Sequence, residues 1–263
     1  MKPRLTSVTL LLLVLIMPVL ACAQKVAVGE VMMIGTSPWK KVPEGLKPSF
    51  RKTEEGKATV HLLQADRGDH NGDFLLVCSI PRANDRGALP KGSPFTDSVI
   101  SFSAGGEGSA SNYISDPGAY TEYRLIGAEK FTSLPVVDLI GIHYIKVKED
   151  RAADFEKFVV EKLHPAVGHI LPDMQLLYYK AVAGDNKGSY ITIFTITSHA
   201  AREVYWPTGN PETQILKDAF LPQRELGREL QPYLVENSYL EEAGGAAAYF
   251  ESKEWTDYLV INE

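Results

Sequence analysis

The stretch from Val136 to Ile196 constrains the fold most, because its hydrophobic pattern changes period along the way. It opens with the apolar run VVDLIGIHYIKV and continues into DFEKFVVEKLHPAVGHI, whose apolar residues recur at helical spacing. Two further apolar segments follow, MQLLYYKAV and SYITIFTI, joined by the polar turn AGDNKG. This order predicts a strand, a helix and a β-hairpin.

The helix is expected to start near Asp150, with acidic residues in its first turn. Pro165 has no backbone N–H, so a kink or an end of the helix is expected there. The apolar face predicted to pack on the sheet consists of Phe155, Phe158, Val159, Leu163, Val167 and Ile170.

A similar order precedes this stretch. KVAVGEVMMIG reads as a strand ending at Gly35, ATVHLLQAD and DFLLVCSI as a hairpin around RGDHNG, and AYTEYRLIGA as a further strand. TSPWKKVPEGLKPSF offers at most a short, proline-interrupted helix around Trp39. Residues 81–118 are rich in Gly, Ser and Pro and are predicted to form a long irregular insertion.

The chain after Ile196 continues the pattern. SHAAREVYWP precedes a helical region from about Glu212 to Glu242, which Pro222 and Pro232 are expected to break. EWTDYLVI is the last expected strand. The second half therefore matches the first, element by element.

Four aligned blocks indicate an internal duplication. Val60–Leu63 aligns with Met174–Leu177 (174 − 60 = 114), and the strand from Asp73 aligns with that from Ser189 (189 − 73 = 116). The motif P-x-G-x-P occurs from Pro90 and again from Pro207 (117), and Tyr120–Tyr123 aligns with Trp255–Tyr258 (135). Loop insertions explain the drift in spacing.

Each half thus reads β–(α)–β–β–(α)–β, which is typical of a ferredoxin-like unit. The predicted fold class is α+β: two tandem ferredoxin-like repeats, residues 25–130 and 131–263, form an intramolecular α+β barrel with antiparallel sheets and helices outside. Because both halves are covalently joined, a monomer is expected.

The N-terminus reads as a signal peptide, residues 1–23. Lys2 and Arg4 precede the apolar run Val8–Leu20, and small residues follow at Ala21 and Ala23. The run is too short for a comfortable membrane span. An exported protein, periplasmic or secreted, is expected. Val19-Leu20-Ala21-Cys22 also resembles a lipoprotein box, so a lipid anchor at Cys22 is the alternative to a soluble product.

Composition narrows the function classes. The net charge is −6, and no basic run lies beyond the first residues, so nucleic-acid binding is not expected. Cys78 lies in an apolar strand pattern and is predicted to be a core residue. No histidine pair has metal-ligand spacing, so no metal site is expected.

Residues Leu139 to Pro207 resemble the dimeric α+β barrel superfamily, which includes antibiotic-biosynthesis-type monooxygenases, EthD-like proteins and NIPSNAP-like proteins. The features that carry the resemblance are His164-Pro165, Leu171-Pro172-Asp173 and Tyr205-Trp206-Pro207. Asp173 stands where the EthD-like members usually have Gly. Lys47 occupies the position of His164 in the first half (164 − 47 = 117), so the resemblance implies one site, in the second half.

Six residues are candidates for that site. His164 is the candidate catalytic base or hydrogen-bond donor, and the resemblance places a cavity between the sheet and the helices. Candidate ligand-binding residues are His143, Tyr178, Tyr190, Tyr205 and Trp206.

Three functions follow from this reading. The first is binding of a small apolar or aromatic molecule, with cofactor-independent monooxygenase or cyclase chemistry. The second is haem binding or degradation with His164 as the axial ligand. The third is a non-enzymatic interaction module of the envelope, in which the aromatic residues only form the core. The first two require an open cavity that reaches His164, and the third predicts a filled one.

Overall fold

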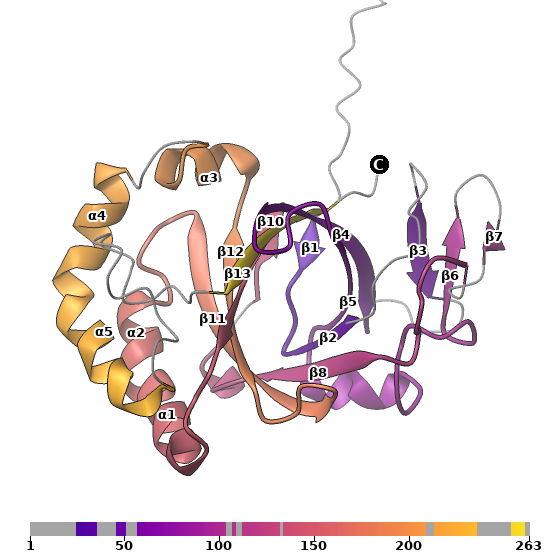
Figure 1. Cartoon of the computed structure of the whole chain (residues 1–263), viewed down its shortest axis with the longest axis horizontal. Helices are drawn as coiled ribbons and strands as arrows, with labels where there is room; N and C mark the ends of the chain where they lie inside the picture. The colour runs from indigo at the N-terminus through magenta and orange to yellow at the C-terminus, as the bar shows by residue number, and fades with distance from the viewer. Residues whose placement is uncertain are drawn as a thin grey trace, which may run out of the picture.

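The computed structural model describes residues 25–35, 46–50, 57–103, 107–108, 112–131, 134–208, 213–235 and 254–260. Eight of its strands close into an antiparallel barrel in the order β10-β12-β11-β8-β2-β5-β4-β13 (Figure 1). The predicted α+β barrel is confirmed. The barrel strands are β2 (Val31–Gly35), β4 (Thr59–Gly68), β5 (Phe74–Ile80), β8 (Tyr120–Leu125), β10 (Leu139–Ile145), β11 (Met174–Gly184), β12 (Tyr190–Ile196) and β13 (Trp255–Val260).

Both halves of the chain contribute four strands in the same relative order, β8-β2-β5-β4 and β13-β10-β12-β11. The ladder registers also agree. The hairpin ends match as well: the Ala65 N–H donates to the Asp73 carbonyl in the first half, and the Ala181 N–H donates to the Ser189 carbonyl in the second, so both strands of the hairpin are offset by 116 (181 − 65 and 189 − 73). The predicted offset of 114 for the block at Val60 was therefore wrong by two residues, because short apolar runs look alike after a shift of one pleat.

The two halves meet at two strand pairs, β4–β13 and β8–β11, and these two seams have the same local structure. Gly68 and Gly184 both have positive φ, and their neighbours Asp69 and Asp185 donate backbone hydrogen bonds to Trp255 and Tyr120, respectively. A Cβ on Gly68 would lie 2.2 Å from the Trp255 carbonyl oxygen, and one on Gly184 would lie 2.0 Å from that of Tyr120. Glycine is required at both positions, because only it permits this backbone conformation and this close approach.

The interior of the barrel is filled by side chains, as expected for eight strands. Each strand alternates between this interior and an outer face, so β10 points Ile140 and Ile142 inward and Leu139 and Ile145 outward. Tyr179 crosses the interior and donates a hydrogen bond from its hydroxyl group to the Gly29 carbonyl oxygen at 2.7 Å. The barrel is therefore a packed core.

Helices cover the outer face of the second half (Figure 1). Their buried residues form one apolar cluster with the outward side chains of β10, β11 and β12. The breaks expected at Pro222 and Pro232 are present as 3₁₀ turns. The helical elements are η4 (Glu149–Arg151), α1 (Ala152–Phe158), α2 (His164–Val167), α3 (His199–Tyr205), α4 (Gln214–Phe220), η6 (Leu221–Gln223), α5 (Arg224–Leu230) and η7 (Gln231–Tyr233).

The helix does not end at Pro165 but continues through it as α2, and the irregular segment precedes the proline. A π-helical segment, η5 (Val159–Leu163), joins α1 to α2 and ends just before the proline, and the backbone N–H of His164 donates to the Val159 carbonyl. The missing N–H of Pro165 and its bulk explain the local widening, since neither allows a regular α-helical turn. The predicted apolar face of this helix is buried at Phe155, Phe158 and Val167.

The first half is covered differently. Residues of the 81–118 insertion, including Leu89, Phe95 and Ile100, pack on the outer face of β2, β4 and β5. Lys47, predicted to be equivalent to His164, lies in a strand of a separate small sheet, and the helix expected around Trp39 falls outside the described residues. The other short elements are β1 (Val26–Ala27), β3 (Lys47–Phe50), η1 (Ala83–Ala88), β6 (Ile100–Ser103), β7 (Glu107–Gly108), η3 (Ala128–Lys130) and β9 (Val136–Val137).

Candidate functional site

A polar group lies on the outer face of the second half, beneath α3. His143 is central to it: the ring is 6% exposed, with ring centroids 4.3 Å from Phe194 and 6.0 Å from Trp255. Thr192 is its register partner on β12, so both side chains point to the same side of the sheet. His143 Nδ1 and Thr192 Oγ1 are both buried and have no hydrogen-bond partner among the described residues.

Asp257 enters the same face from β13, opposite Gly141 on β10. Gly141 makes room for it: a Cβ there would lie 2.8 Å from Asp257 Oδ1 and 3.5 Å from His143 Nε2. The carboxylate and the imidazole therefore flank one glycine. Any larger residue at 141 would displace one of them.

Arg202, from α3, closes the group from above and is only 2% exposed. Its Nη1 bonds to Asp66, and its Nη2 donates to Glu203 and to His199 Nε2, both at 3.0 Å. Its Nη1 lies 3.8 Å from Asp257 Oδ2. Arg202 Nε has no partner in the described part of the chain. Three buried polar atoms on one face thus lack the partner that buried polar groups normally have.

Burial sets the protonation of this group. It lowers the pKa of His143 to about 3, so the ring is neutral at physiological pH. It raises the pKa of Asp257 to about 6, although the guanidinium groups of Arg202 and Arg67 oppose the shift. Asp257 can therefore accept and release a proton close to neutral pH, whereas His143 can only donate or accept a hydrogen bond.

The surroundings of His164 differ from those of His143. Its ring meets Phe131 edge-on at 4.5 Å and lies 5.7 Å from the ring of His169. Its Nε2 atom is buried without a partner among the described residues and would lie 2.6 Å from a Cβ on Gly168. Burial and the neighbouring His169 lower the pKa of His164. In the described part of the chain, His164 and His143 thus have no aromatic ring neighbour in common.

The predicted aromatic residues divide between these surroundings. Trp206 contacts Phe194, at a ring-centroid distance of 6.5 Å, and so belongs to the His143 side. Tyr205 donates to Asp173 at 3.2 Å, and Tyr190 donates to Glu156 at 2.7 Å. Tyr178 is buried in the apolar cluster under the helices. These four tyrosine and tryptophan side chains are largely part of the packed layer.

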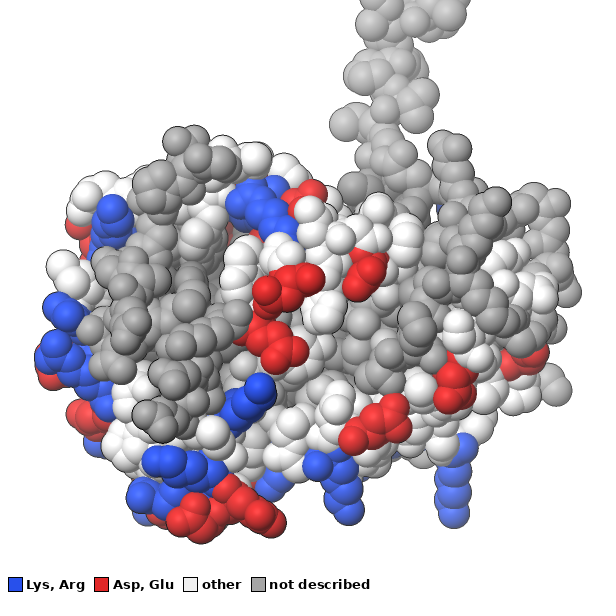
Figure 2. Space-filling view, viewed as in Figure 1, with Lys and Arg blue, Asp and Glu red and all other residues white. Residues whose placement is uncertain are grey.

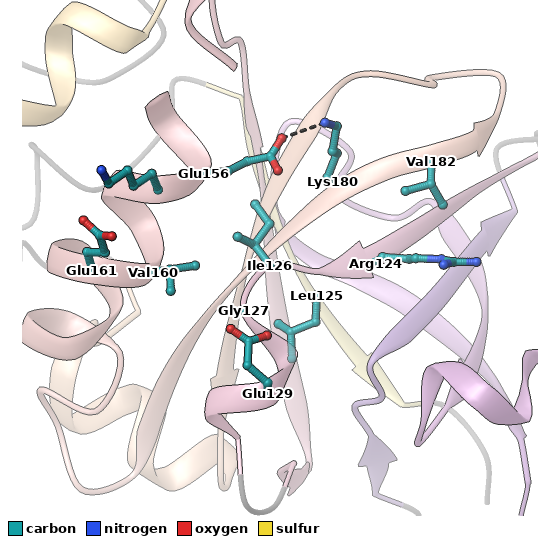
Figure 3. A pocket seen from close by; sticks show the side chains of 11 residues that line it. Arg124, Leu125, Ile126, Gly127, Glu129, Glu156, Val160, Glu161, Lys180 and Val182 are labelled. Carbon is teal, nitrogen blue, oxygen red and sulfur yellow. Dashed lines mark hydrogen bonds and ion pairs between the residues drawn. The ribbon is translucent and has the colours of Figure 1, made fainter. Parts of the chain in front are cut away.

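A groove of about 430 Å³ lies at the seam between β8, β11 and the α1–η5 helix (Figure 3). Lys180 donates to Glu156 at 2.6 Å across it, and the same carboxylate oxygen accepts the Tyr190 hydroxyl group. His164 does not line it. The lining residues are Arg124, Leu125, Ile126, Gly127, Glu129, Glu156, Lys157, Val160, Glu161, Lys180 and Val182.

Asp257 and Arg202 were not predicted as site residues. Their signal was weak: Asp257 lies in a block used only for the repeat alignment, and Arg202 lies in an amphipathic helix. A carboxylate on a strand and an arginine on a short helix are ordinarily solvent-exposed. Only the closure of the barrel, which pairs β13 with both β10 and β4, buries them together.

The described surface adds little to this picture. Figure 2 shows acidic and basic side chains interspersed over the described part of one face, without an extended basic patch. No described helix is both long and apolar enough to cross a membrane. Within the described ranges, no three His, Cys, Asp or Glu side chains gather as metal ligands.

No protein-family model and no curated protein matches this chain. Among solved structures it is similar to a "putative monooxygenase" from Lactobacillus acidophilus NCFM, with a TM-score of 0.40 and 11% identity over 77% of either chain. It is also similar to an anthrone oxidase-like protein, with a TM-score of 0.36 and 11% identity, covering 88% of this chain and 90% of the other. At these TM-scores and identities, the similarity is one of backbone path alone.

Proposed function

We propose that the protein binds a small, apolar or aromatic molecule on the helix-facing side of its second half, beside His143 and Asp257. The observation that carries the proposal is a set of three buried polar atoms, on His143, Thr192 and Arg202, that have no hydrogen-bond partner among the described residues. The His143 ring also lies beside the rings of Phe194 and Trp255. Buried polar groups without partners are costly and are kept where a ligand or a reaction uses them.

The chemistry that this site supports is proton removal without a cofactor. Asp257 is the base, because its raised pKa lets it hold a proton near neutral pH, and neutral His143 orients the substrate. Removing a proton from an acidic C–H or O–H group leaves an electron-rich anion. That anion can attack an electrophilic carbon of the same molecule and close a ring. Alternatively, its carbon adds O₂ and forms a peroxide. The O–O bond then breaks as that carbon loses its remaining hydrogen, so the carbon becomes a carbonyl and the second oxygen atom leaves as water with the two hydrogens that the substrate has lost.

A catalytic role for His164 stays a prediction. Its Nε2 atom is enclosed by Gly168 and Phe131, so a reacting group could reach it only after α2 had moved. The haem alternative needs the same atom to face a cavity. The described surroundings of Nε2 do not fit an axial haem ligand, because the atom is buried against the Gly168 backbone.

The non-enzymatic alternative also has support. Tyr178, Tyr190 and Tyr205 belong to one buried cluster that fills the space between the sheet and the helices. Core packing alone accounts for these three tyrosines. It does not account for the unpartnered atoms around His143, and for this reason we favour the binding function.

The binding function is tested by purifying the protein natively, identifying bound small molecules by mass spectrometry, and titrating 2-naphthol as an aromatic probe. Saturable binding that weakens about tenfold or more in His143→Phe supports the site. His61→Phe is the matched control, since His61 is an equally buried histidine of the first half. Equal effects of the two variants, or no binding at all, would refute the proposal.

We further propose that the chain is an exported monomer built from two tandem repeats. The equal registers and equivalent glycines of the two seams support the duplication. N-terminal sequencing of the processed protein from a bacterial host distinguishes cleavage after Ala23 from lipidation at Cys22. Light scattering that gives twice the chain mass would exclude the monomer.

A further inference from the structure

The two halves carry the same arginine–carboxylate pair at equivalent positions. Arg86 follows β5 as Arg202 follows β12 (202 − 86 = 116), the offset that the hairpin registers give. Glu122 on β8 matches Asp257 on β13 (257 − 122 = 135), the offset that also relates Arg124 to Leu259 beside the first strand of each half. The pair can therefore be compared within one molecule.

In the first half the pair is closed, which means that the arginine and the carboxylate are directly hydrogen-bonded. Arg86 Nε donates to Glu122 Oε2 at 2.9 Å, and the carboxylate is 6% exposed. Met33 is the register partner of Glu122 on β2, and its buried side chain fills the space beside it. A buried carboxylate held by a guanidinium in this way is a structural ion pair.

In the second half the equivalent pair is open, which means that its two side chains lie beyond hydrogen-bond distance. Asp257 is one methylene shorter than Glu122, its register partner is Gly141 instead of methionine, and its closest approach to Arg202 is 3.8 Å. In Arg86 the Nε atom makes the hydrogen bond to the carboxylate. In Arg202 the Nε atom has no hydrogen-bond partner among the described residues. Both side chains at this point are thus smaller than in the first half, Asp instead of Glu and Gly instead of Met, and the Asp257 carboxylate lies against Gly141 without the close arginine bond that Glu122 has.

We propose that Arg202 Nε and the Asp257 carboxylate together form a subsite for a ligand hydroxyl group, an inference that rests on the proposed binding function. The hydroxyl oxygen accepts the Nε–H bond of Arg202, and its hydrogen is donated to the Asp257 carboxylate. Only a group that is both donor and acceptor satisfies both partners.

The surrounding charges define the ligand further. Arg202 already pairs with Asp66 and Glu203, and Asp257 adds a third carboxylate, so a ligand carboxylate would face repulsion. Phe194 and Trp255 present apolar ring faces on either side of His143. The ligand class is therefore a neutral aromatic molecule with a hydroxyl group.

The test exchanges the two carboxylates. Asp257→Glu should rebuild the closed pair in the second half, and Glu122→Asp, the matched control, should open the pair of the first half without touching the subsite. The full-length protein and both variants are titrated with 2-naphthol, naphthalene and 2-naphthoate. We expect the parent protein and Glu122→Asp to bind 2-naphthol about tenfold or more tightly than the other two probes. Asp257→Glu should lose that preference.

The outcomes separate the two proposals. If 2-naphthol and naphthalene bind equally well to the parent protein, or if Asp257→Glu keeps the preference, the hydroxyl subsite is wrong while the binding function stands. If no probe binds the parent protein, the binding function fails. An NMR measurement of the Arg202 Nε–H resonance checks the geometry independently, because hydrogen exchange should slow in Asp257→Glu. An unchanged exchange rate would show that the pair does not close and would overturn the comparison itself.

Discussion

The Nη1 atom of Arg202 and the Oδ2 atom of Asp257 lie 3.8 Å apart, beyond hydrogen-bond distance, although both side chains are withdrawn from solvent. In the equivalent pair of the first half, Arg86 Nε and Glu122 Oε2 lie 2.9 Å apart. This difference distinguishes the second half from the first in a barrel whose halves otherwise share strand order and register, and it is the reason for proposing the ligand site there.

Asp257 should give the protein a measurable pH dependence. Its pKa in the folded state is about 6, above the ordinary value of 3.8, so folding favours its protonated form. Stability is therefore lost as the pH rises from about 4 to about 6, by an amount on the order of 3 kcal/mol for this group. Asp257→Asn should match the parent protein at pH 4 and exceed its unfolding free energy at pH 7.5. Urea unfolding at both pH values measures this, with the exposed Asp154→Asn as control. A stability difference independent of pH would contradict the assignment.

Arg202 should be costly to remove. Arg202→Met leaves Asp66 and Glu203 without their buried partner, and about 3–5 kcal/mol of unfolding free energy should be lost. Arg228→Met removes an exposed ion pair with Glu225 and should cost less than about 1 kcal/mol. Chemical denaturation compares the two variants. Similar losses would show that the Arg202 network is not a buried one.

Gly184 should tolerate no side chain. Gly184→Ala would need a left-handed backbone at φ 87° and would bring its Cβ to 2.0 Å from the Tyr120 carbonyl oxygen, so a loss of about 3 kcal/mol or more is expected. Gly188 in the same hairpin also has positive φ but open space around it. Gly188→Ala should cost only about 1–2 kcal/mol. Thermal unfolding of both variants tests the seam, and equal costs would argue against a close contact there.

Tyr190 should contribute more to stability than Lys180, although both donate to Glu156 Oε1. Tyr190 is buried, whereas solvent reaches the ion pair of Lys180. Tyr190→Phe should lose about 2 kcal/mol of unfolding free energy, and Lys180→Met less than about 1 kcal/mol. The reverse order in urea unfolding would mean that the ion pair, and not the phenol, anchors Glu156.

Local patterns predicted most of the architecture. Apolar runs on either side of RGDHNG and AGDNKG correspond to the hairpins β4–β5 and β11–β12. Pro222 and Pro232 break the last helical region where expected, whereas the helix continues through Pro165 after the π-helical segment η5. These features depend on a residue and its near neighbours, so the chain alone carries them. The insertion 81–118 was harder to predict, because its apolar residues are widely spaced and gain a common partner only on the outer face of the first sheet.

The sequence by itself determined the strands, the hairpins and the breaks of the last helical region, since periodicity and turn chemistry are local properties. The tertiary structure alone decided which polar residues form the candidate site. Asp257 is remote in the chain from Gly141 and Arg202, and only closure of the barrel places β13 beside β10 under α3. Burial at that point raises the pKa of the Asp257 carboxylic acid, and the Nε atom of Arg202 finds no hydrogen-bond partner within the described ranges. No local sequence pattern encodes either effect.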